Sequence, residues 1–474
     1  MKIKLGQKEL EMNTVAEFCG GEIYDFTGES GSSFGYVCTD SREADESTMF
    51  VATRGERVDG HDYILGAIER GCRCILCEYV PNNVASKKVC FVVVENSIEA
   101  FAHTARGYRK NSHLKTVAVT GSVGKTTTKE LTALIMRQKY DVYSTVGNFN
   151  SVIGMPMSLM EAGEDKQAAV FEMGMSGFGE ISAMSACATP DVAMVTNIGS
   201  SHLEYLKTRE NIAKAKLEIA DGLSDGGYLL LAGDEPILRG SVVNKYKNKC
   251  KILYVGKNAG NNNDILIQNI RILKDKTVFD LNFLGKAYSD IEVSAIGAHF
   301  ATNAAFAASA ALLMGCDEEN IRAGLASYVA GNMRQNISER GGVTVVADCY
   351  NAAPESMRAS LDVLGDMSVK GKRIAVLGDM RELGHSSVSL HFEIGKYVAE
   401  HGVDMLFTLG ELGAEIAVGA ISSGVDKNNV FVERDIENID HFAEKIRSSL
   451  TSGDAILFKA SRALALERII EKIF

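Results

Sequence analysis

Short runs of apolar and β-branched residues alternate along the chain with stretches that have the periodicity of amphipathic helices. In the middle of the chain these runs cover Thr116–Thr120, Ala168–Glu172 and Val192–Asn197. Their length and their Val and Thr content favour buried strands. Strands that alternate with helices form a mostly parallel sheet, which binds ligands at the carboxyl ends of its strands. We therefore predict an α/β fold with a parallel sheet at its centre.

The same alternation recurs on both sides of this middle stretch. Near the amino terminus, strand-like runs cover Ser47–Thr53, Cys74–Glu78 and Val89–Val94, with helical patterns between them. Towards the carboxyl terminus, four such runs predict a doubly wound, Rossmann-like sheet: Val343–Asp348, Arg373–Gly378, Met405–Leu409 and Ala455–Lys459. Because 474 residues exceed what one hydrophobic core supports, we predict three domains. They cover residues 1–112, 113–330 and 331–474.

Two stretches of the middle domain are less regular. Residues 228–293 have the pattern of hairpin-like strands, with a turn at Gly260–Asn263. Asn211–Leu223 has the pattern of a helix, on which Lys214 and Glu218 would pair at i,i+4 on a solvated face.

A glycine-rich turn follows the strand Thr116–Thr120. The sequence Gly121-Ser-Val-Gly-Lys-Thr126 opens a helix, so its backbone N–H groups can surround phosphate oxygens, Lys125 can reach the outer phosphates and Thr126 can bind Mg²⁺. The full nucleotide-binding motif has a Gly where Val119 stands, so this is a shortened Gly-x-x-Gly-Lys-Thr form. A strand–turn–helix with an incidental Lys is the alternative, which the preceding strand makes less favourable.

Two polar residues lie beyond the carboxyl ends of the neighbouring strands. Glu172 ends the run Ala168–Glu172, and His202 lies shortly after Val192–Asn197. In a parallel sheet both can converge on the glycine turn, where a carboxylate and an imidazole beside a triphosphate suit Mg²⁺ or Mn²⁺. Each residue also has an ordinary structural explanation, as a strand end or a helix cap.

Composition and charge narrow the possible functions. The net charge of −11 argues against a general nucleic-acid or anionic-membrane binder, and no uncharged apolar run reaches membrane-spanning length. The first ten residues lack the apolar segment of a signal peptide, so we expect a cytoplasmic protein. The cysteines are scattered, and Cys72, Cys74 and Cys77 are interpreted as core thiols rather than metal ligands.

These motifs together resemble the ATP-dependent Mur ligases, and the resemblance extends over all three predicted domains. Thr39-Asp-Ser-Arg42 and Asp59-Gly-His61 are similar to the UDP-sugar domain of that family, and Thr120–Thr126 to its ATP loop. Glu172-Met-Gly-Met-Ser176 and Asn197–Glu204 are similar to its metal-binding segments. Gly378-Asp-Met-Arg-Glu-Leu-Gly384 and the segment from Tyr350 to Met357 resemble the branch that adds a dipeptide; the Asp-Asn-Pro-Arg motif of the diaminopimelate-adding branch is absent.

The resemblance implies a specific reaction. The protein would be an ADP-forming ligase that joins D-alanyl-D-alanine to UDP-N-acetylmuramoyl-tripeptide through an acyl phosphate, during peptidoglycan precursor synthesis. It would use ATP, two Mg²⁺ ions (or Mn²⁺) and a CO₂-derived carbamate on Lys216, and the family expectation is a monomer.

The resemblance also assigns residues to roles. Those expected to act in catalysis are Lys125, Glu172, His202, Lys216 and Arg334. Those expected to bind ATP are Thr120, Gly121, Ser122, Val123, Gly124, Lys125, Thr126, Thr127, Asn303, Arg334, Asp348 and Tyr350. Those expected to bind metal are Thr126, Glu172, His202 and Lys216. Those expected to bind the other substrates are Ser41, Arg42, Asp59, His61, Asn148, Asn150, Asp379, Lys459, Ser461 and Arg462.

Two alternatives remain open at this point. Folylpolyglutamate synthases share the expected fold and the loop but lack the UDP-binding front domain. A degenerate homologue could bind nucleotide without catalysing a ligation, although Lys125, Thr126, Glu172, His202 and Lys216 are all present.

Overall fold

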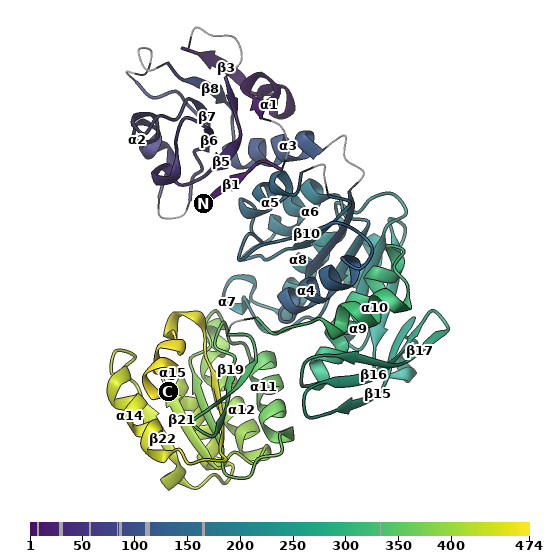
Figure 1. The fold of residues 1–474 in the computed structure, drawn as a ribbon, viewed down its shortest axis with the longest axis vertical. Helices are drawn as coiled ribbons and strands as arrows, with labels where there is room; N and C mark the ends of the chain where they lie inside the picture. The colour runs from purple at the N-terminus through teal and green to yellow at the C-terminus, as the bar shows by residue number, and fades with distance from the viewer. Residues whose placement is uncertain are drawn as a thin grey trace.

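Three large β-sheets, each covered by helices, follow one another along the chain (Figure 1). The computed structural model describes residues 1–6, 9–27, 32–55, 58–82, 84, 88–109, 114–163, 166–331 and 333–474. The first unit lies at the top of Figure 1, the central unit in the middle and the third at the lower left. The predicted boundary between residues 112 and 113 lies outside the described residues, so it stays a prediction, as does that at 330.

The first sheet is parallel in its middle and antiparallel at both edges. Its strands lie in the order β1 (Lys2–Lys4), β5 (Tyr36–Cys38), β6 (Thr48–Val51), β7 (Cys74–Cys77), β8 (Cys90–Val93) and β3 (Glu22–Asp25). A small ladder of β2 (Leu10–Glu11) and β4 (Ser33–Phe34) lies beside it. The helices of this unit are α1 (Met12–Cys19), α2 (Ile64–Glu69) and α3 (Ser97–Arg109). Cys72, Cys74 and Cys77 are buried free thiols, as the sequence indicated.

The central sheet carries the glycine loop. Its strands lie in the order β10 (Val142–Ser144), β11 (Ala168–Glu172), β9 (Lys115–Thr120), β12 (Val192–Val195), β13 (Tyr228–Ala232), β14 (Lys251–Gly256), β15 (Ile265–Ile272), β16 (Thr277–Phe283) and β17 (Lys286–Val293). Neighbouring strands run parallel from β10 to β15, and β15 to β17 are antiparallel.

This topology corrects the expectation of hairpins throughout residues 228–293. The strands β13 and β14 are parallel, because 3₁₀ turns at Pro236–Arg239 and Ser241–Tyr246 carry the chain back between them. Only the last three strands form hairpins.

Helices cover both faces of the central sheet. They are α4 (Lys125–Met136), α5 (Gly154–Ala162), α6 (Glu180–Ala188), α7 (Leu203–Leu206), α8 (Arg209–Leu217), α9 (Ala298–Leu313) and α10 (Glu318–Ala326). Along β9, Val117 and Val119 join one hydrophobic cluster and Ala118 joins another, so both faces are buried. This double burial explains why the strand is an unbroken apolar run.

The helix predicted over Asn211–Leu223 is shorter than expected. The helix α8 ends at Leu217 and a 3₁₀ turn follows at Glu218–Ala220. The Glu218 carboxylate accepts hydrogen bonds from the backbone N–H groups of Gly179 and Ser182. The predicted Lys214–Glu218 pair is therefore wrong, because Glu218 instead stabilises the amino end of α6.

The third sheet is parallel except for its first strand. Its order is β18 (Asn336–Arg340), β19 (Val343–Ala347), β23 (Ala455–Lys459), β20 (Arg373–Gly378), β21 (Met405–Leu409) and β22 (Val430–Glu433). Its helices are α11 (Pro354–Asp366), α12 (Ser387–Glu400), α13 (Gly413–Ser422), α14 (Ile439–Ser449) and α15 (Glu467–Ile473). This arrangement confirms the predicted doubly wound fold. Among the described residues, no helix is long and apolar enough to cross a membrane.

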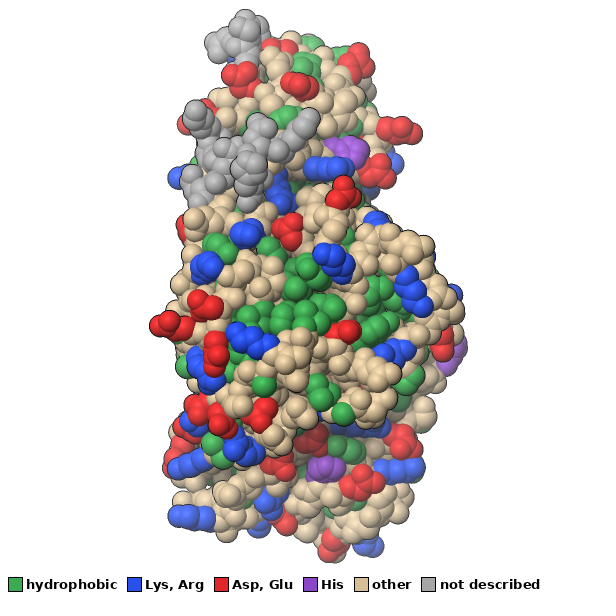
Figure 2. All heavy atoms as spheres, turned by 90° about the vertical axis from the view of Figure 1, so that its right-hand side faces the viewer, with side chains coloured by type: hydrophobic (Ala, Val, Ile, Leu, Met, Phe, Trp, Pro, Cys, Tyr) green, Lys and Arg blue, Asp and Glu red, His purple; other side chains and the backbone are tan. Residues whose placement is uncertain are grey.

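The surface is mixed in charge on the face that Figure 2 presents. Basic and acidic side chains are interspersed from top to bottom, and hydrophobic side chains gather at mid-height, over the central unit.

Candidate functional site

The glycine loop joins β9 to α4 at the carboxyl edge of the central sheet. Gly124 has a φ of +81°, in the left-handed region that favours glycine, and Lys125 is the first residue of α4. A Cβ atom on Gly124 would lie 2.7 Å from Oδ1 of Asn303, a residue of α9. The predicted strand, turn and helix are therefore present, and the loop passes directly beside Asn303.

The side-chain amide of Asn197, a residue expected in a metal-binding segment and not in the loop, holds the glycine loop. Oδ1 of Asn197 accepts hydrogen bonds from the backbone N–H groups of Ser122 (2.8 Å) and Val123 (3.0 Å). The Ser122 hydroxyl in turn accepts from the N–H group of Gly199 (2.8 Å). The segment after β12 thus sets the shape of the loop.

The Lys125 side chain folds back over the loop. Its ammonium group donates to the carbonyl oxygens of Gly121 (2.9 Å) and Ser122 (3.3 Å). Burial lowers the pKa of Lys125, and the negative charge of Glu172 opposes that shift. Since the acceptors are neutral carbonyl groups, a phosphate anion would form stronger, charge-assisted hydrogen bonds with this ammonium group.

Glu172 lies at the end of β11 and is buried. Its Oε2 accepts a hydrogen bond from the Thr126 hydroxyl (2.7 Å), and its Oε1 accepts one from the side-chain amide of Asn150 (2.8 Å). Asn148, on the same loop as Asn150, is exposed. The structure therefore brings Thr126, Glu172 and Asn150 together beside the loop.

Lys216 is buried on α8, with 1% of its surface exposed. Burial, with a smaller contribution from the positive charge of Lys125, lowers the pKa of Lys216 well below its ordinary value. Within the described part of the chain, its amine forms no hydrogen bond or ion pair. Lys214, two positions earlier, is exposed. An unpaired buried amine is costly, so this environment favours the neutral form.

His202 immediately precedes α7. The helix α7 lies on the side of the central unit that faces the third unit (Figure 1). The φ of His202 is +66°, and its Nδ1 lies 2.6 Å from Oε2 of Glu382, which belongs to the third unit. The close contact with His202 lowers the pKa of Glu382, and burial opposes this shift. His202 is therefore linked to the third unit.

The donor set around the loop suits Mg²⁺ only together with a bound phosphate. Among the described residues, no group of three or more His, Cys, Asp or Glu side chains is arranged to hold a metal ion. Mg²⁺ is usually bound through one or two carboxylates together with the phosphates of the substrate. The hydrogen-bonded hydroxyl and carboxylate of Thr126 and Glu172 fit that pattern.

Two of the predicted nucleotide contacts from the third unit lie next to each other. The guanidinium carbon of Arg334 lies 3.9 Å from the centre of the Tyr350 ring, a cation–π contact. Arg334 also contributes positive potential at Lys125 and Glu130, which belong to the central unit. The positive charge of Arg334 therefore acts on Lys125, the residue that opens α4.

Asp348 and Lys459 form a buried ion pair at the carboxyl ends of β19 and β23. Nζ of Lys459 lies 2.6 Å from Oδ2 of Asp348, which also accepts a hydrogen bond from Ser360 (2.5 Å). Burial by itself would raise the pKa of Asp348, but Lys459 and Ser360 outweigh it, and the pKa is lowered. Lys459, predicted to bind substrate, is thus paired with Asp348, which is predicted to bind ATP.

Breaking this pair should destabilise the third unit. In Asp348→Asn the Lys459 ammonium stays buried without its counter-charge, so we expect a loss of about 3–5 kcal/mol, measured by urea unfolding. Because the folded-state pKa of Asp348 is depressed, its contribution is fully present above about pH 4 and is lost as the pH falls through the folded value. The double variant with Lys459→Met should recover part of the loss; additive losses would contradict the pairing.

The other predicted residues of the third unit lie around the carboxyl end of β20. Asp379 Oδ1 accepts a hydrogen bond from the N–H group of Gly413, at the start of α13, over 2.7 Å. The Ser461 hydroxyl accepts from the N–H group of Arg381 (2.9 Å), and the Arg462 side chain is paired with Glu467. Asp379 and Ser461 thus support the loop between β20 and α12.

A groove of about 510 Å³ lies in the first unit, bounded by the predicted residues Ser41 and Arg42. The guanidinium group of Arg42 is half of an exposed ion pair with Asp40 (2.6 Å). His61, in contrast, is buried: its Nδ1 lies 2.6 Å from Asp59, and its Nε2 accepts from the N–H group of Glu78. The structure therefore places Ser41 and Arg42 at the groove, while Asp59 and His61 support the loop beneath it.

Comparison with known proteins places this arrangement in a family. Residues 34–122 match the Mur ligase family, catalytic domain; residues 119–311 the Mur ligase middle domain; and residues 333–462 the Mur ligase, glutamate ligase domain. The UDP-N-acetylmuramoyl-tripeptide--D-alanyl-D-alanine ligase of Bacillus subtilis is 35% identical over 98% of both chains. The chain belongs to the Mur ligase family. The ligase of that same name from Escherichia coli is 31% identical, over 92% of this chain and 93% of its own.

Solved structures agree with this Mur ligase over almost its whole length. A crystal structure of MurF from Acinetobacter baumannii superposes with a TM-score of 0.87 at 27% identity and covers 99% of both chains. The MurF ligase of Thermotoga maritima, solved in complex with ADP, gives a TM-score of 0.79 at 30% identity, over 92% of this chain and 96% of its own. The family and the three-unit α/β fold expected from the sequence are therefore confirmed.

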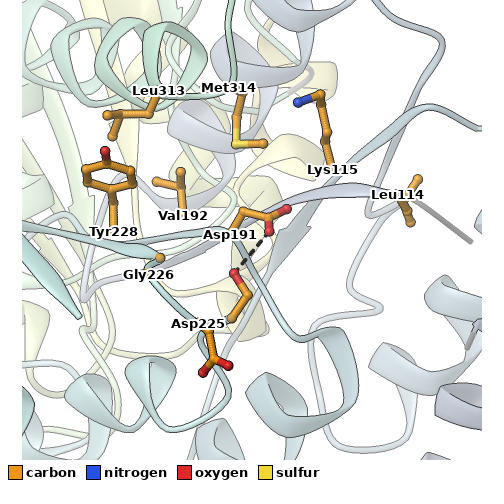
Figure 3. Close-up of a pocket in the computed structure, with 11 residues that line it drawn as sticks. Leu114, Lys115, Asp191, Val192, Asp225, Gly226, Tyr228, Leu313 and Met314 are labelled. Carbon is orange, nitrogen blue, oxygen red and sulfur yellow. Dashed lines mark hydrogen bonds between the residues drawn. The ribbon is translucent and has the colours of Figure 1, made fainter. Parts of the chain in front are cut away.

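A second cavity of this Mur ligase lies at the opposite edge of the central sheet. Its volume is about 430 Å³, and the first residues of β9, β12 and β13 line it, with Leu313 and Met314 from the end of α9 (Figure 3). Asp191 in this cavity accepts hydrogen bonds from Thr116 and Ser224, so its carboxylate is already satisfied. This cavity is separated from the loop by the length of the strands.

Proposed function

We propose that this Mur ligase uses ATP to join D-alanyl-D-alanine to UDP-N-acetylmuramoyl-tripeptide, forming the pentapeptide precursor of peptidoglycan. The likeness to D-alanyl-D-alanine-adding ligases over 98% of the chain carries this proposal. The gathering of Lys125, Thr126 and Glu172 at the carboxyl edge of the central sheet supports it. ATP as the nucleotide is supported by the ADP held by the relative from Thermotoga maritima.

The reaction must make a poor acyl donor reactive. A carboxylate does not react with an amine in water, so the γ-phosphoryl group of ATP is first transferred to the acceptor carboxylate, which gives an acyl phosphate and ADP. The amine of D-alanyl-D-alanine then attacks the acyl carbon, and phosphate leaves. In such transfers the protein mainly positions anions and neutralises their charge. Lys125, whose acceptors within the described part of the chain are neutral carbonyl groups, would hold the β- and γ-phosphates.

Thr126, Glu172 and His202 would hold Mg²⁺. When bound, two such ions would neutralise the charge that develops on the phosphoryl oxygens and the acceptor carboxylate. Lys216 would contribute as a carbamate. Its depressed pKa supports this assignment, because only a neutral amine reacts with CO₂. The carbamate is an oxygen-donor anion, which Mg²⁺ prefers over an ammonium group.

The three units would have different tasks. The groove at Ser41 and Arg42 would take the UDP moiety in the unit 1–112, and the unit 113–330 would bind ATP. The unit 331–474 would contribute Arg334 to the phosphates and the residues around Asp379 to the dipeptide. Closure of this unit would exclude water from the acyl phosphate. We propose that the enzyme acts as a cytoplasmic monomer.

A folylpolyglutamate synthase and a non-catalytic homologue are the two alternatives, and each predicts a different substrate requirement for phosphate release from ATP. A folylpolyglutamate synthase of Mycobacterium tuberculosis has a TM-score of 0.61 at 16% identity and covers 79% of this chain, a likeness of fold alone. Phosphate release from ATP should require both UDP-N-acetylmuramoyl-tripeptide and D-alanyl-D-alanine. Release that instead requires a folate and glutamate would select the synthase, and binding of ATP without any release would select a non-catalytic homologue.

A further inference from the structure

A loop of the third unit lies against the segment that carries His202. This loop follows β20, and the carbonyl oxygen of its residue Glu382 accepts a hydrogen bond from the N–H group of Glu204 (3.1 Å). A Cβ atom on Gly384 would lie 3.0 Å from Cα of Glu204, so the two backbones are in close contact. The proposed function above leaves Glu382 without a role.

The conformation of both segments aims two side chains at each other. His202 and Glu382 each have a φ of +66°, an unusual value for residues other than glycine that costs on the order of 1–3 kcal/mol at each position. Oε2 of Glu382 lies 2.6 Å from Nδ1 of His202. Such strained residues cluster at functional sites, where the surrounding structure holds them in place. The strain therefore points to a role for this contact.

The chemistry of imidazole indicates what the contact does. A neutral imidazole carries one proton, and a carboxylate beside Nδ1 keeps the proton on that nitrogen. The lone pair of Nε2 is then available to a metal ion. Metal-binding histidines usually donate their other N–H group to a carboxylate or carbonyl, which orients the ring and increases its basicity.

We propose that Glu382 is a positioning residue for His202, supplied by the third unit to complete a metal site of the central unit. Metal binding and docking of the third unit are then coupled, since His202 is correctly oriented only when the Glu382 loop lies against it. This inference rests on the proposed function, which makes His202 a metal ligand. The opposite arrangement, in which Glu382 competes with the metal for His202, predicts the opposite effect of removing the carboxylate.

Mn²⁺ binding to the full-length protein distinguishes a Glu382 that orients His202 for the metal from a Glu382 that competes with the metal for His202. Mn²⁺ would be titrated by electron paramagnetic resonance in the presence of a non-hydrolysable ATP analogue. We expect Glu382→Gly to weaken Mn²⁺ binding about 10-fold or more, the usual effect of losing such a partner. Glycine tolerates the positive φ of this position, so the loop should keep its shape. Glu382→Gln, which retains an acceptor oxygen, should restore part of the affinity.

The matched control is Glu411→Gln, which removes a charge from an exposed ion pair elsewhere in the third unit and should leave Mn²⁺ binding unchanged. Pulsed resonance should detect ¹⁴N coupling from imidazole in the wild-type protein and a weaker signal in Glu382→Gly. Unchanged or tighter Mn²⁺ binding by Glu382→Gly would overturn the proposal. Ligase turnover of the wild-type protein is measured separately, so failure of the proposed function would be seen there and not confused with this result.

Discussion

Lys216→Ala should lower ligase turnover by about 10³-fold, the upper range for loss of a group that stabilises charge in the transition state. Lys216 is buried, its amine has no hydrogen-bond or ion-pair partner among the described residues, and its pKa is depressed, an environment that favours reaction with CO₂ over a role in packing. Short carboxylates such as acetate or formate can enter the space left by the side chain and replace the carbamate oxygens. We therefore expect partial rescue of phosphate release when such carboxylates are added to Lys216→Ala.

Lys214→Ala is the matched control, because Lys214 is on the same helix but exposed, and its turnover should match that of the wild-type protein. Lys216→Ala should remain folded at the assay temperature, which its thermal unfolding midpoint checks, since removal of the buried amine removes a desolvation cost that offsets part of the cost of the cavity. Full activity of Lys216→Ala would exclude the carbamate and its role in metal binding.

Lys125→Met should lower turnover by about 10²- to 10³-fold, because the β- and γ-phosphates would lose the one cation that the glycine loop itself supplies. In the structure this ammonium group contacts only backbone carbonyl groups of the loop among the described residues, so no ion pair needs to break before it binds phosphate. Two measurements check this prediction in Lys125→Met. Phosphate release under saturating substrates should fall, and so should the increase in the thermal unfolding midpoint that ATP causes.

Lys139→Met provides the comparison for Lys125→Met. Lys139 lies beyond the end of α4, is exposed and donates to the carbonyl oxygen of Gly315, away from the loop. The Lys139→Met variant should retain both the turnover and the ATP-dependent stabilisation of the wild-type protein. If Lys125→Met kept the turnover of this control, the glycine loop would not be the phosphate site.

The hydrophobic pattern predicted strands best where burial on both faces alone determines the residue types. The run Arg373–Gly378 is β20 residue for residue, because a strand buried on both faces must be apolar throughout. The pattern was less informative where strands are half-exposed or very short. β18 and β1 lie at sheet edges and were not predicted, and the parallel crossover from β13 to β14 was taken for a hairpin. The number of residues between β13 and β14 did not indicate whether the two strands run parallel or antiparallel.

The residues around the loop were predicted because chemistry restricts their type. Glycine at 124 is needed for a positive φ, and a Lys and a Thr must open the following helix if phosphate and Mg²⁺ are to be bound. Asn197 was missed as a loop contact, although it ends the predicted strand Val192–Asn197. An Asn at a strand end is common, and only the fold shows that its amide reaches Ser122 and Val123.

From the sequence alone, the strand, glycine turn and helix at Thr116–Met136, the α/β class and the resemblance to Mur ligases could be established, because each depends on residue types at fixed, local spacings. The tertiary structure decided which distant groups meet. It placed Glu382 beside His202, Asp348 beside Lys459 and the amine of Lys216 in the interior. These contacts join segments far apart in the chain, and burial and charge pairing, which set the reactivity of each group, depend on the packing of the whole fold.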